Sequence, residues 1–377
     1  EKKLLADREL TSITYDGRYQ KEIGIFNVCD GCFENSLSLK KVTFINTKKA
    51  IFAPFSFSGC INIENISMLG VEELEFGASC FSCDEKLKII EFKCKKINLG
   101  DKCFDRCNSL EYFSFPDSSN NSFEFLPSSS FKGYHIFIGN ECFTNMANLK
   151  CIVLQSDEIK LGERTFSNCP KLSTIKIESN HDISITSSTF EGSNSLTDVT
   201  LKSKSTVELK KGSLCSNNIL SSVSLNGSRA IIGDDCFNDS FSDYNKQNYY
   251  NKPPKTFSIY SEESVDIGTN SFRGSKMLSS VTIRCKDLTI KDNCFNECSS
   301  ISQFELEELS TISFGQSAFS KCSNLTRLKM NAKNSIHFSS LSFKECPINE
   351  IELSSDEIQI EPECFLHSNI KKITLLQ

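Results

Sequence analysis

The chain has 377 residues, a formal net charge of −6 and 38% hydrophobic residues, which is enough to form a folded core. The acidic balance argues against nucleic acid as the main partner, because binding to phosphates requires a clustered basic face. No apolar run reaches the roughly 18 residues that a membrane-spanning helix needs, so we expect no membrane span. The chain has 30 Phe, 19 Cys, 4 His and no Trp. Such a skew indicates one local environment that is repeated many times.

We expect residues 1–22 to form an N-terminal cap or flank, because they do not match the pattern that follows. Residues 23–377 repeat one frame around an anchor Phe that usually follows Cys, Ser or Thr. The anchors are Phe33, Phe57, Phe81, Phe104, Phe143, Phe166, Phe190, Phe237, Phe272, Phe295, Phe319, Phe343 and Phe365, and Leu214 takes this position once. Successive anchors are 22 to 24 residues apart, with two exceptions of 39 and 35. This spacing predicts a solenoid of about 14 coils.

Each anchor lies between two patterns of apolar residues. Two apolar residues stand seven and five positions before it, as in Ile97/Leu99 and Leu288/Ile290, and Gly often stands four before it. Cys often stands three after it, and an L-x-x-[VIF]-x-[LIF] run follows, as in Leu172 to Ile177. That run ends in a period-two alternation and predicts a short strand with one buried face, and the earlier pair predicts a second extended segment. The Gly indicates a turn with positive φ or with a close approach of two backbones.

These elements together predict a right-handed repeat solenoid with a continuous parallel β-sheet. The Cys-Phe-x-x-Cys stretch between the two segments suits a single helical or 3-10 turn with its Phe pointing inward. Two insertions interrupt the period, at residues 117–135 and 239–254. The chain ends just after a predicted strand, so we expect either further coils in the native chain or an open strand edge.

The frame resembles the BspA-type leucine-rich repeat. The segments IKLGERTFSNCPKLSTIKI (Ile159 to Ile177) and ISFGQSAFSKCSNLTRLKM (Ile312 to Met330) match that repeat almost position by position. The chain departs from the family in lacking the Pro that often follows the strand, since Pro116 is the single example. The resemblance implies a leucine-rich-repeat coil in a surface or secreted protein of a bacterium or an anaerobic protist. It also implies adhesion to host matrix proteins or cells, and a role as a surface antigen.

The cysteines allow more than one interpretation. Cys29-x-x-Cys32 and Cys80-x-x-Cys83 have the spacing of zinc or redox motifs. However, 13 of the 19 Cys stand one before or three after an anchor, where Ser, Thr or Ala also occur. We therefore favour small buried packing residues, mostly as reduced thiols. The four His share no position in the frame, and no nucleophile, phosphate-loop or zinc-helix motif occurs, so we predict no catalytic site, no metal and no cofactor.

The best candidate binding surface is the outward-facing side of the predicted strands. The position just after the strand varies while the frame stays uniform, as expected where a repeat scaffold tunes recognition. The candidates there are Lys93, Glu178, Lys202, Tyr260, Arg284 and Glu307, joined by Tyr244, Tyr249 and Tyr250 in the second insertion. The alternative is an ordinary solvated sheet face beside a plain surface loop.

Two functions remain open at this point. The first is a non-enzymatic, cell-surface or secreted module that binds a host, matrix or cell-surface protein. The second is an intracellular protein-interaction scaffold, which the many cysteines favour because cytosolic thiols stay reduced. Neither function involves nucleic acid. Five Asn-x-Ser/Thr sequons, which are acceptor sites for glycans in secreted proteins, give weak support to secretion.

Overall fold

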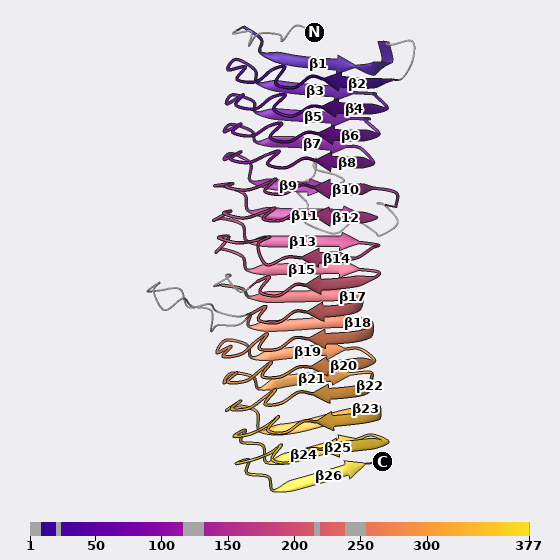
Figure 1. Cartoon of the computed structure of the whole chain (residues 1–377), viewed down its shortest axis with the longest axis vertical. Coiled ribbons are helices and arrows are strands. Elements are labelled where there is room, and N and C mark those ends of the chain that lie inside the picture. The colour runs from indigo at the N-terminus through magenta and orange to yellow at the C-terminus, as the bar shows by residue number, and fades with distance from the viewer. Residues whose placement is uncertain (1–8, 20–23, 116–131, 215–218, 238–253, 377) are drawn as a thin grey trace. The chain divides into compact units, whose positions relative to one another are not determined.

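The computed structural model describes residues 9–19, 24–115, 132–214, 219–237 and 254–376, which belong to two compact units. The first unit comprises Glu1–His181 and Ser188–Asn194, and the second comprises Asp182–Ser187 and Ser195–Gln377. Each unit is a parallel β-solenoid in which strands of successive coils stack on one another (Figure 1). The predicted fold class is therefore confirmed. Within the described ranges, no helix is long and apolar enough to cross a membrane.

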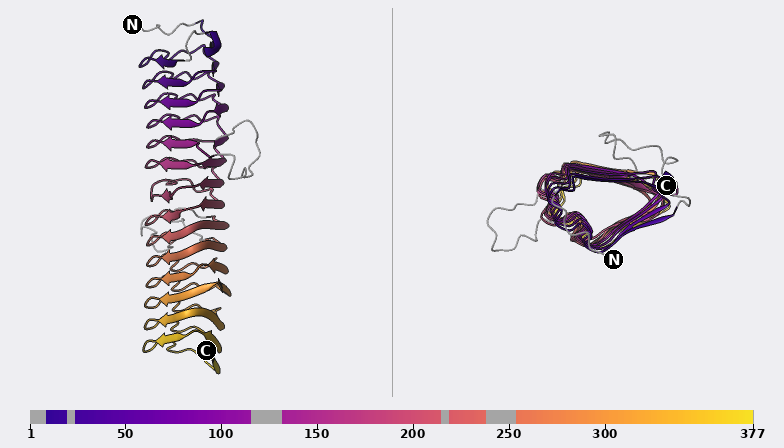
Figure 2. Two further views of the ribbon diagram at one scale, coloured as in Figure 1. Left: turned by 90° about the vertical axis from the view of Figure 1, so that its right-hand side faces the viewer. Right: turned by 90° about the horizontal axis from the view of Figure 1, so that it is seen from above.

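Each coil has three sides, which are a first strand, a second strand and a turn that carries the anchor Phe (Figure 2). In the first unit, the first strands are β1 (Ser12–Asp16), β3 (Lys41–Ile45), β5 (Asn65–Leu69), β7 (Ile89–Lys93), β9 (Tyr112–Phe115), β11 (Cys151–Ser156) and β13 (Thr174–Ser179). The second strands are β2 (Ile25–Val28), β4 (Lys49–Phe52), β6 (Glu73–Phe76), β8 (Lys96–Leu99), β10 (His135–Ile138) and β12 (Glu158–Leu161). A short 3-10 helix, η1 (Gly17–Tyr19), follows β1.

The ladders of the first unit are parallel. The second strands form one sheet in the order β2-β4-β6-β8-β10-β12, and the first strands pair as β1-β3-β5-β7 and as β9-β11-β13. The sheet of first strands is thus divided between β7 and β9. Inside the predicted N-terminal flank, β1 pairs with β3 from Ser12↔Lys41 to Asp16↔Ile45, as later first strands pair with one another. Most of the insertion predicted at 117–135 lies outside the described residues.

The second unit repeats the same plan with some longer strands. Its elements are β14 (Ile183–Ile185), β15 (Asp198–Ser203), β16 (Thr206–Leu209), β17 (Ser222–Ile232), β18 (Thr256–Ile267), β19 (Ser280–Arg284), β20 (Asp287–Ile290), β21 (Gln303–Glu307), β22 (Leu309–Phe314), β23 (Arg327–Phe338), β24 (Glu350–Ser354), β25 (Glu357–Ile360) and β26 (Lys372–Leu376). The strands β17, β18 and β23 each run through both strand positions of a coil. Of the insertion predicted at 239–254, only residue 254 is described.

The core of each unit is a column of anchor rings. In the first unit, Phe81 and Phe104 are fully buried, and their ring centroids lie 5.4 Å apart with nearly parallel planes. In the second unit, the rings of Phe295 and Phe319 are also stacked, with their centroids 4.8 Å apart. One coil cannot bury such a ring by itself, so each coil depends on its neighbours for stability.

The turn around the anchor is not the helical turn that the sequence predicts. In the coil of Phe57, residues two before and two after the anchor, Phe55 and Gly59, have φ of 56° and 71°. The N–H groups of these two residues and of Phe57 donate to carbonyls of the next coil, at 2.9 to 3.0 Å. The left-handed residues turn every second N–H toward the neighbouring coil, so the turn forms a third ladder between coils. A helix would have kept those bonds within one coil.

The Gly four positions before the anchor is required by close packing of coils. A Cβ built on Gly100 would lie 2.6 Å from the backbone carbon of Gly77, which stands at the same position one coil earlier. Gly100 is absent from the residues with positive φ. Of the two explanations that the sequence allows for this Gly, the close approach of two backbones is therefore correct.

Candidate functional site

Four of the predicted site residues fall in a single row across the first strands of the second unit. Parallel pairing joins Lys202 to Asn226, Asn226 to Tyr260, Tyr260 to Arg284 and Arg284 to Glu307. These five residues, the Tyr260 row, come from β15, β17, β18, β19 and β21. Neighbouring strands in a sheet lie about 4.8 Å apart. The alternation of the strands turns all five side chains away from the core.

The Tyr260 row combines exposure with varied chemistry. Asn226, Arg284 and Glu307 are exposed, Lys202 is half-buried, and Tyr260 has 41% of its surface exposed. A buried row of Val223, Phe257 and Val281 holds the same strands against the core. An amide, a phenol, a guanidinium and a carboxylate therefore stand side by side on a rigid support, which suits recognition of another protein.

Arg284, within this row, already forms an ion pair with Glu308, which lies beside the row. Its Nη2 donates to Glu308 Oε1 at 2.5 Å, and this contact raises the pKa of Arg284 and lowers that of Glu308. Both side chains are largely solvent-exposed. Exposed ion pairs add little to stability, so a partner can replace Glu308 at a small cost.

A strip of short hydroxyl side chains runs beside the Tyr260 row. It consists of Thr200, Ser224, Ser258 and Thr282, which pair in register across the same strands. The next strand continues the strip with Glu305. Because these side chains are short, they leave the backbone face of the sheet low next to Tyr260 and Arg284. The long side chains of the row therefore project beyond this strip of short polar side chains.

The other predicted residues lie elsewhere. Lys93 is exposed in the first unit, at the end of β7, where it pairs with Leu69. Glu178 in β13 is buried, with 3% of its surface exposed, and accepts a hydrogen bond from Gln155 Nε2 at 2.9 Å. Its expected place on an exposed face is therefore wrong. The alternation of a strand predicts which side chains point outward, but it does not predict what covers them. Tyr244, Tyr249 and Tyr250 lie outside the described residues.

Two members of this region, Asn226 and Glu308, were not predicted from the sequence. Asn226 stands in the same position after its strand as Tyr260, but the insertion at 239–254 separates the two coils in sequence. The signal was present, since Val223 and Leu225 match the strand pattern and place Asn226 directly after it. Glu308 follows the row by one residue, and its left-handed backbone, with φ of 63°, directs it outside the regular frame.

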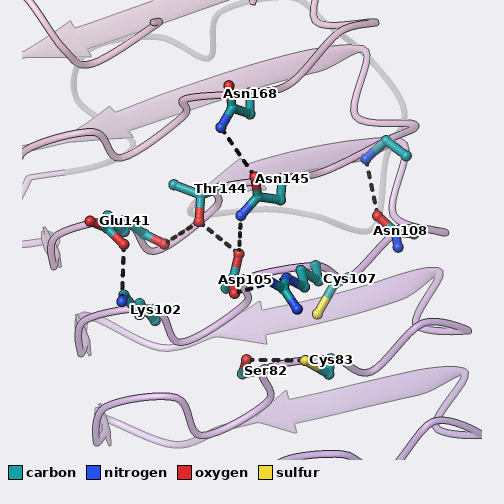
Figure 3. Close-up of polar contacts among 12 residues, drawn as sticks. Ser82, Cys83, Lys102, Asp105, Cys107, Asn108, Glu141, Thr144, Asn145 and Asn168 are labelled. Atoms are coloured by element: carbon teal, nitrogen blue, oxygen red, sulfur yellow. Dashed lines mark hydrogen bonds and ion pairs between the residues drawn. The ribbon is translucent and has the colours of Figure 1, made fainter. Parts of the chain in front are cut away.

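The turn face of the first unit is polar, but its side chains serve the stacking of coils. Figure 3 shows Asp105 accepting hydrogen bonds from Thr144 Oγ1 and Asn145 Nδ2, both at 2.8 Å. Asn145 Oδ1 accepts in turn from Asn168 Nδ2 at 3.2 Å. Lys102 forms an ion pair with Glu141 of the next coil at 3.2 Å. Because these groups use their hydrogen bonds on neighbouring coils, the turn face is a weaker candidate than the Tyr260 row.

A shallow depression of about 450 Å³ opens on the second strands of the first unit. It is lined by Glu72, Glu73, Lys95, Lys96, Gly133, His135, Phe137 and Glu158. His135 Nδ1 lies 3.5 Å from Glu158 Oε2, and Lys160 pairs with the same carboxylate at 2.8 Å. Small-molecule sites are mostly apolar with a few polar groups, whereas this lining is mostly charged. In the second unit, His337 Nε2 lies 3.3 Å from Glu361 Oε1, so each of these two His contacts a different carboxylate.

The cysteines after the anchors have a structural task that the sequence did not reveal. The Sγ of Cys107 donates to the carbonyl oxygen of Phe81 at 3.1 Å, and Cys322 donates to Phe295 at 3.2 Å. Ser193 makes the same bond to Phe166 at 2.8 Å. In these coils a small side chain at this position donates a hydrogen bond to the previous anchor. Among the described residues, no group of His, Cys, Asp or Glu could hold a metal ion.

Comparison with known proteins supports the assignment of the repeat. The family model for the BspA type leucine rich repeat region matches residues 21–137, 125–244 and 242–372. A search among curated proteins finds no match.

Similar solved structures include three bacterial proteins. A leucine-rich repeat protein from Bacteroides ovatus is 14% identical, with 93% of this chain and 88% of that chain covered and a TM-score of 0.42. A leucine rich cell surface protein from Faecalibacterium prausnitzii is 13% identical, with 97% and 90% covered and a TM-score of 0.30. The pneumococcal vaccine antigen PcpA is 13% identical, with 97% and 81% covered and a TM-score of 0.24.

Proposed function

This chain belongs to the BspA-type leucine-rich repeat family, and from that premise we propose that it is a non-enzymatic scaffold that binds another protein through the Tyr260 row. The observation that carries the proposal is the register of Lys202, Asn226, Tyr260, Arg284 and Glu307 on one exposed face. Tyr and Arg supply most of the energy in many protein interfaces, and here both are held on paired strands. The partner is a host, matrix or cell-surface protein.

We propose that the binding is a function of a cell-surface or secreted protein, as the family resemblance implies. Immunofluorescence on unpermeabilised cells of the source organism, with antibodies to this chain, tests the location. Labelling that requires permeabilisation would contradict it.

Tyr244, Tyr249 and Tyr250 are a second proposed group of contacts, tested by deleting residues 240–252 and measuring binding.

The proposed site is tested by a paired substitution. The double variant Tyr260→Ala/Arg284→Ala removes the two expected main contacts, and Thr289→Ala/Ser313→Ala is the matched control on the second strands of the same unit. Both chains are tested for binding to purified matrix proteins and to intact host cells. We expect the row variant to bind about 30-fold more weakly or worse, and the control to bind like the native chain.

Two results would count against the proposal. Equal binding by both variants would remove the Tyr260 row as the site and leave the function itself standing. A native chain that binds neither matrix proteins nor intact cells would contradict the adhesion function.

An intracellular scaffold is the second candidate, and the cysteines favour it. Among the described residues, 16 cysteines are free and all but Cys83 are buried. Reduced thiols of this number are compatible with a cytosolic protein. Thiol titration of protein freshly isolated from its source tests this candidate, because a majority of oxidised cysteines would exclude it.

A further inference from the structure

One cysteine pair differs from the rest. Cys29 and Cys32 form a disulfide whose Cα atoms lie 5.3 Å apart. The pair closes the turn Cys29-Asp30-Gly31-Cys32, just after β2 in the first unit. Cys29 is exposed, whereas Cys32 has 8% of its surface exposed. One sulfur of the bond therefore belongs to an accessible residue and the other to a shielded one.

The turn does not need this bond in order to form. Cys32 N–H donates to the Cys29 carbonyl oxygen at 3.2 Å, which already closes the turn. The next coil closes the equivalent turn by a bond from Ser56 to Ala53 at 3.3 Å, without any cross-link. A disulfide over four residues also removes little freedom from the unfolded chain. Its presence therefore calls for an explanation other than the shape of the coil.

The free cysteines of the described residues have a different character. Burial raises the pKa of the Cys169 thiol to about 12, and its Sγ donates to the carbonyl oxygen of Phe143 at 3.2 Å. Cys364 and Cys94 are also buried, with pKa values raised to about 12. Thiols in such surroundings are inert, because the reactive form is the exposed thiolate. Cys83 is the one free cysteine of the described residues that is not buried, so accessible sulfur in that part of the chain is limited to Cys83 and the Cys29–Cys32 pair.

We propose that Cys29–Cys32 is a thiol–disulfide exchange site that takes a thiol of a partner protein or a small-molecule thiol as its substrate. A thiolate attacks Sγ of Cys29, a new sulfur–sulfur bond forms there, and the Cys29–Cys32 bond breaks. The electron pair leaves on Sγ of Cys32, which then takes up a proton. A second thiolate attacks the substrate sulfur of the mixed disulfide and releases Cys29 as a thiolate, which also takes up a proton. Two substrate thiols are thereby oxidised to one disulfide, and the pair is reduced to two thiols.

The asymmetry of exposure assigns the two sulfurs different roles. Cys29 is the residue that forms the mixed disulfide, because an incoming thiol can reach it. Cys32 is the leaving thiol, since the coil covers it. The local backbone holds this arrangement, because Gly31 N–H donates to Pro54 of the next coil at 3.1 Å and has φ of 57°.

The first test uses the native chain and needs no substitution. The folded protein is incubated with excess reduced glutathione, alkylated without denaturant, and analysed by peptide mass spectrometry. We expect Cys29 to be alkylated only after glutathione treatment, while the fully buried cysteines stay unlabelled and the circular dichroism spectrum is unchanged. A Cys29 that stays unlabelled after glutathione treatment would overturn the proposal.

The second test separates the roles of the two sulfurs. The variants Cys32→Ser and Cys29→Ser are incubated with oxidised glutathione, with Cys103→Ser as the control that keeps the pair intact. We expect Cys32→Ser to capture glutathione at Cys29 at least 10-fold faster than Cys29→Ser captures it at Cys32. Equal rates, or no capture by Cys32→Ser, would refute the assignment. Comparing melting temperatures of the three variants shows whether each is folded before capture is scored.

Discussion

Asp84 stands where most coils have a hydrogen-bond donor, and its burial predicts that the stability of the protein depends on pH. It lies three residues after the anchor Phe81, the position that Cys60 and Cys107 hold in the neighbouring coils. Asp84 is fully buried, and neither of its carboxyl oxygens accepts a side-chain hydrogen bond among the described residues. Burial raises the pKa of Asp84 well above its ordinary value. The folded chain therefore favours the neutral form of this side chain.

The substitution Asp84→Ser should stabilise the protein, and the gain should grow with pH. Ser193 shows that a hydroxyl fits this position, since it donates to the previous anchor at 2.8 Å. The raised pKa means that the folded chain holds the Asp84 proton more tightly than the unfolded chain does. The native chain therefore keeps this contribution fully below the ordinary carboxyl pKa and loses it as pH rises toward the folded pKa. The loss amounts to about 1.4 kcal/mol per pH unit over that interval.

The assay is urea denaturation followed by circular dichroism at pH 4, 5, 6 and 7. The free energy of unfolding is compared between the native chain, Asp84→Ser and the control Glu85→Ser, which removes an exposed acid from the next position. We expect the difference between Asp84→Ser and the native chain to widen as pH rises above about 4, by at most about 1.4 kcal/mol per pH unit, and the control to show no such slope. A difference that is the same at every pH would refute the reasoning, because it would mean that Asp84 is ionised at the same pH in both states.

Three further substitutions test the coil itself, each by urea denaturation. Replacing Cys107 by Ala should cost about 1–3 kcal/mol more than replacing it by Ser, because only Ser keeps a donor for the buried carbonyl oxygen of Phe81; equal losses would contradict the donor role. The variant Phe104→Ala should lose about 3–5 kcal/mol, since it removes a fully buried ring from the stack, and a loss under 1 kcal/mol would contradict that packing. The variant Gly100→Ala should lose about 1–3 kcal/mol, because its Cβ would lie 2.6 Å from the backbone of Gly77; an unchanged stability would show that the coils can move apart.

The coil and its core could be predicted from the sequence because every coil places the same position in the same environment. Phe104 and Phe319 lie in columns of anchor rings, and both are fully buried as expected. A residue type that recurs at a fixed spacing reports a recurring contact, which one coil alone would not reveal. The same argument covers Ile97 and Leu99, whose alternation predicted the second strand that β8 forms.

The turn could not be predicted in the same way, because its backbone is imposed by pairing between coils. Lys102, Arg106 and Glu141 have φ of 55°, 61° and 53°, a region that side chains other than Gly, Asn and Asp seldom adopt. The conformational cost of this left-handed backbone is offset by hydrogen bonds between coils, such as the one from the N–H of Lys102 to the carbonyl oxygen of Asn140 at 2.9 Å. The residue types at these three positions do not indicate a left-handed conformation, although the position two residues after the anchor holds Gly59 and Gly192 in other coils.

For the candidate site, the sequence predicts which side chains point outward, but it does not predict which of them other parts of the chain bury. The strand pattern predicts that Tyr260, Arg284 and Glu178 point away from the core, since each follows two inward apolar residues. Only the packed structure distinguishes exposed Tyr260 from Glu178, which is buried beside Gln155. Outward direction depends on the period of a strand, whereas burial depends on segments that are remote in sequence.

Stability and the proposed recognition depend on different residues of the same strands, and this separation makes the Tyr260 row a suitable place for a binding surface. Phe257 and Ile259 point inward on either side of Ser258 and are buried, so they hold β18 whatever stands at Tyr260. On the turn face, by contrast, Asp105 accepts two hydrogen bonds from the next coil, and changing it would disturb the stack. Substitution in the Tyr260 row therefore alters the exposed chemistry while the coil keeps its inward contacts. A repeat protein can acquire a new partner most easily at such positions, because surface changes away from the core usually cost little stability.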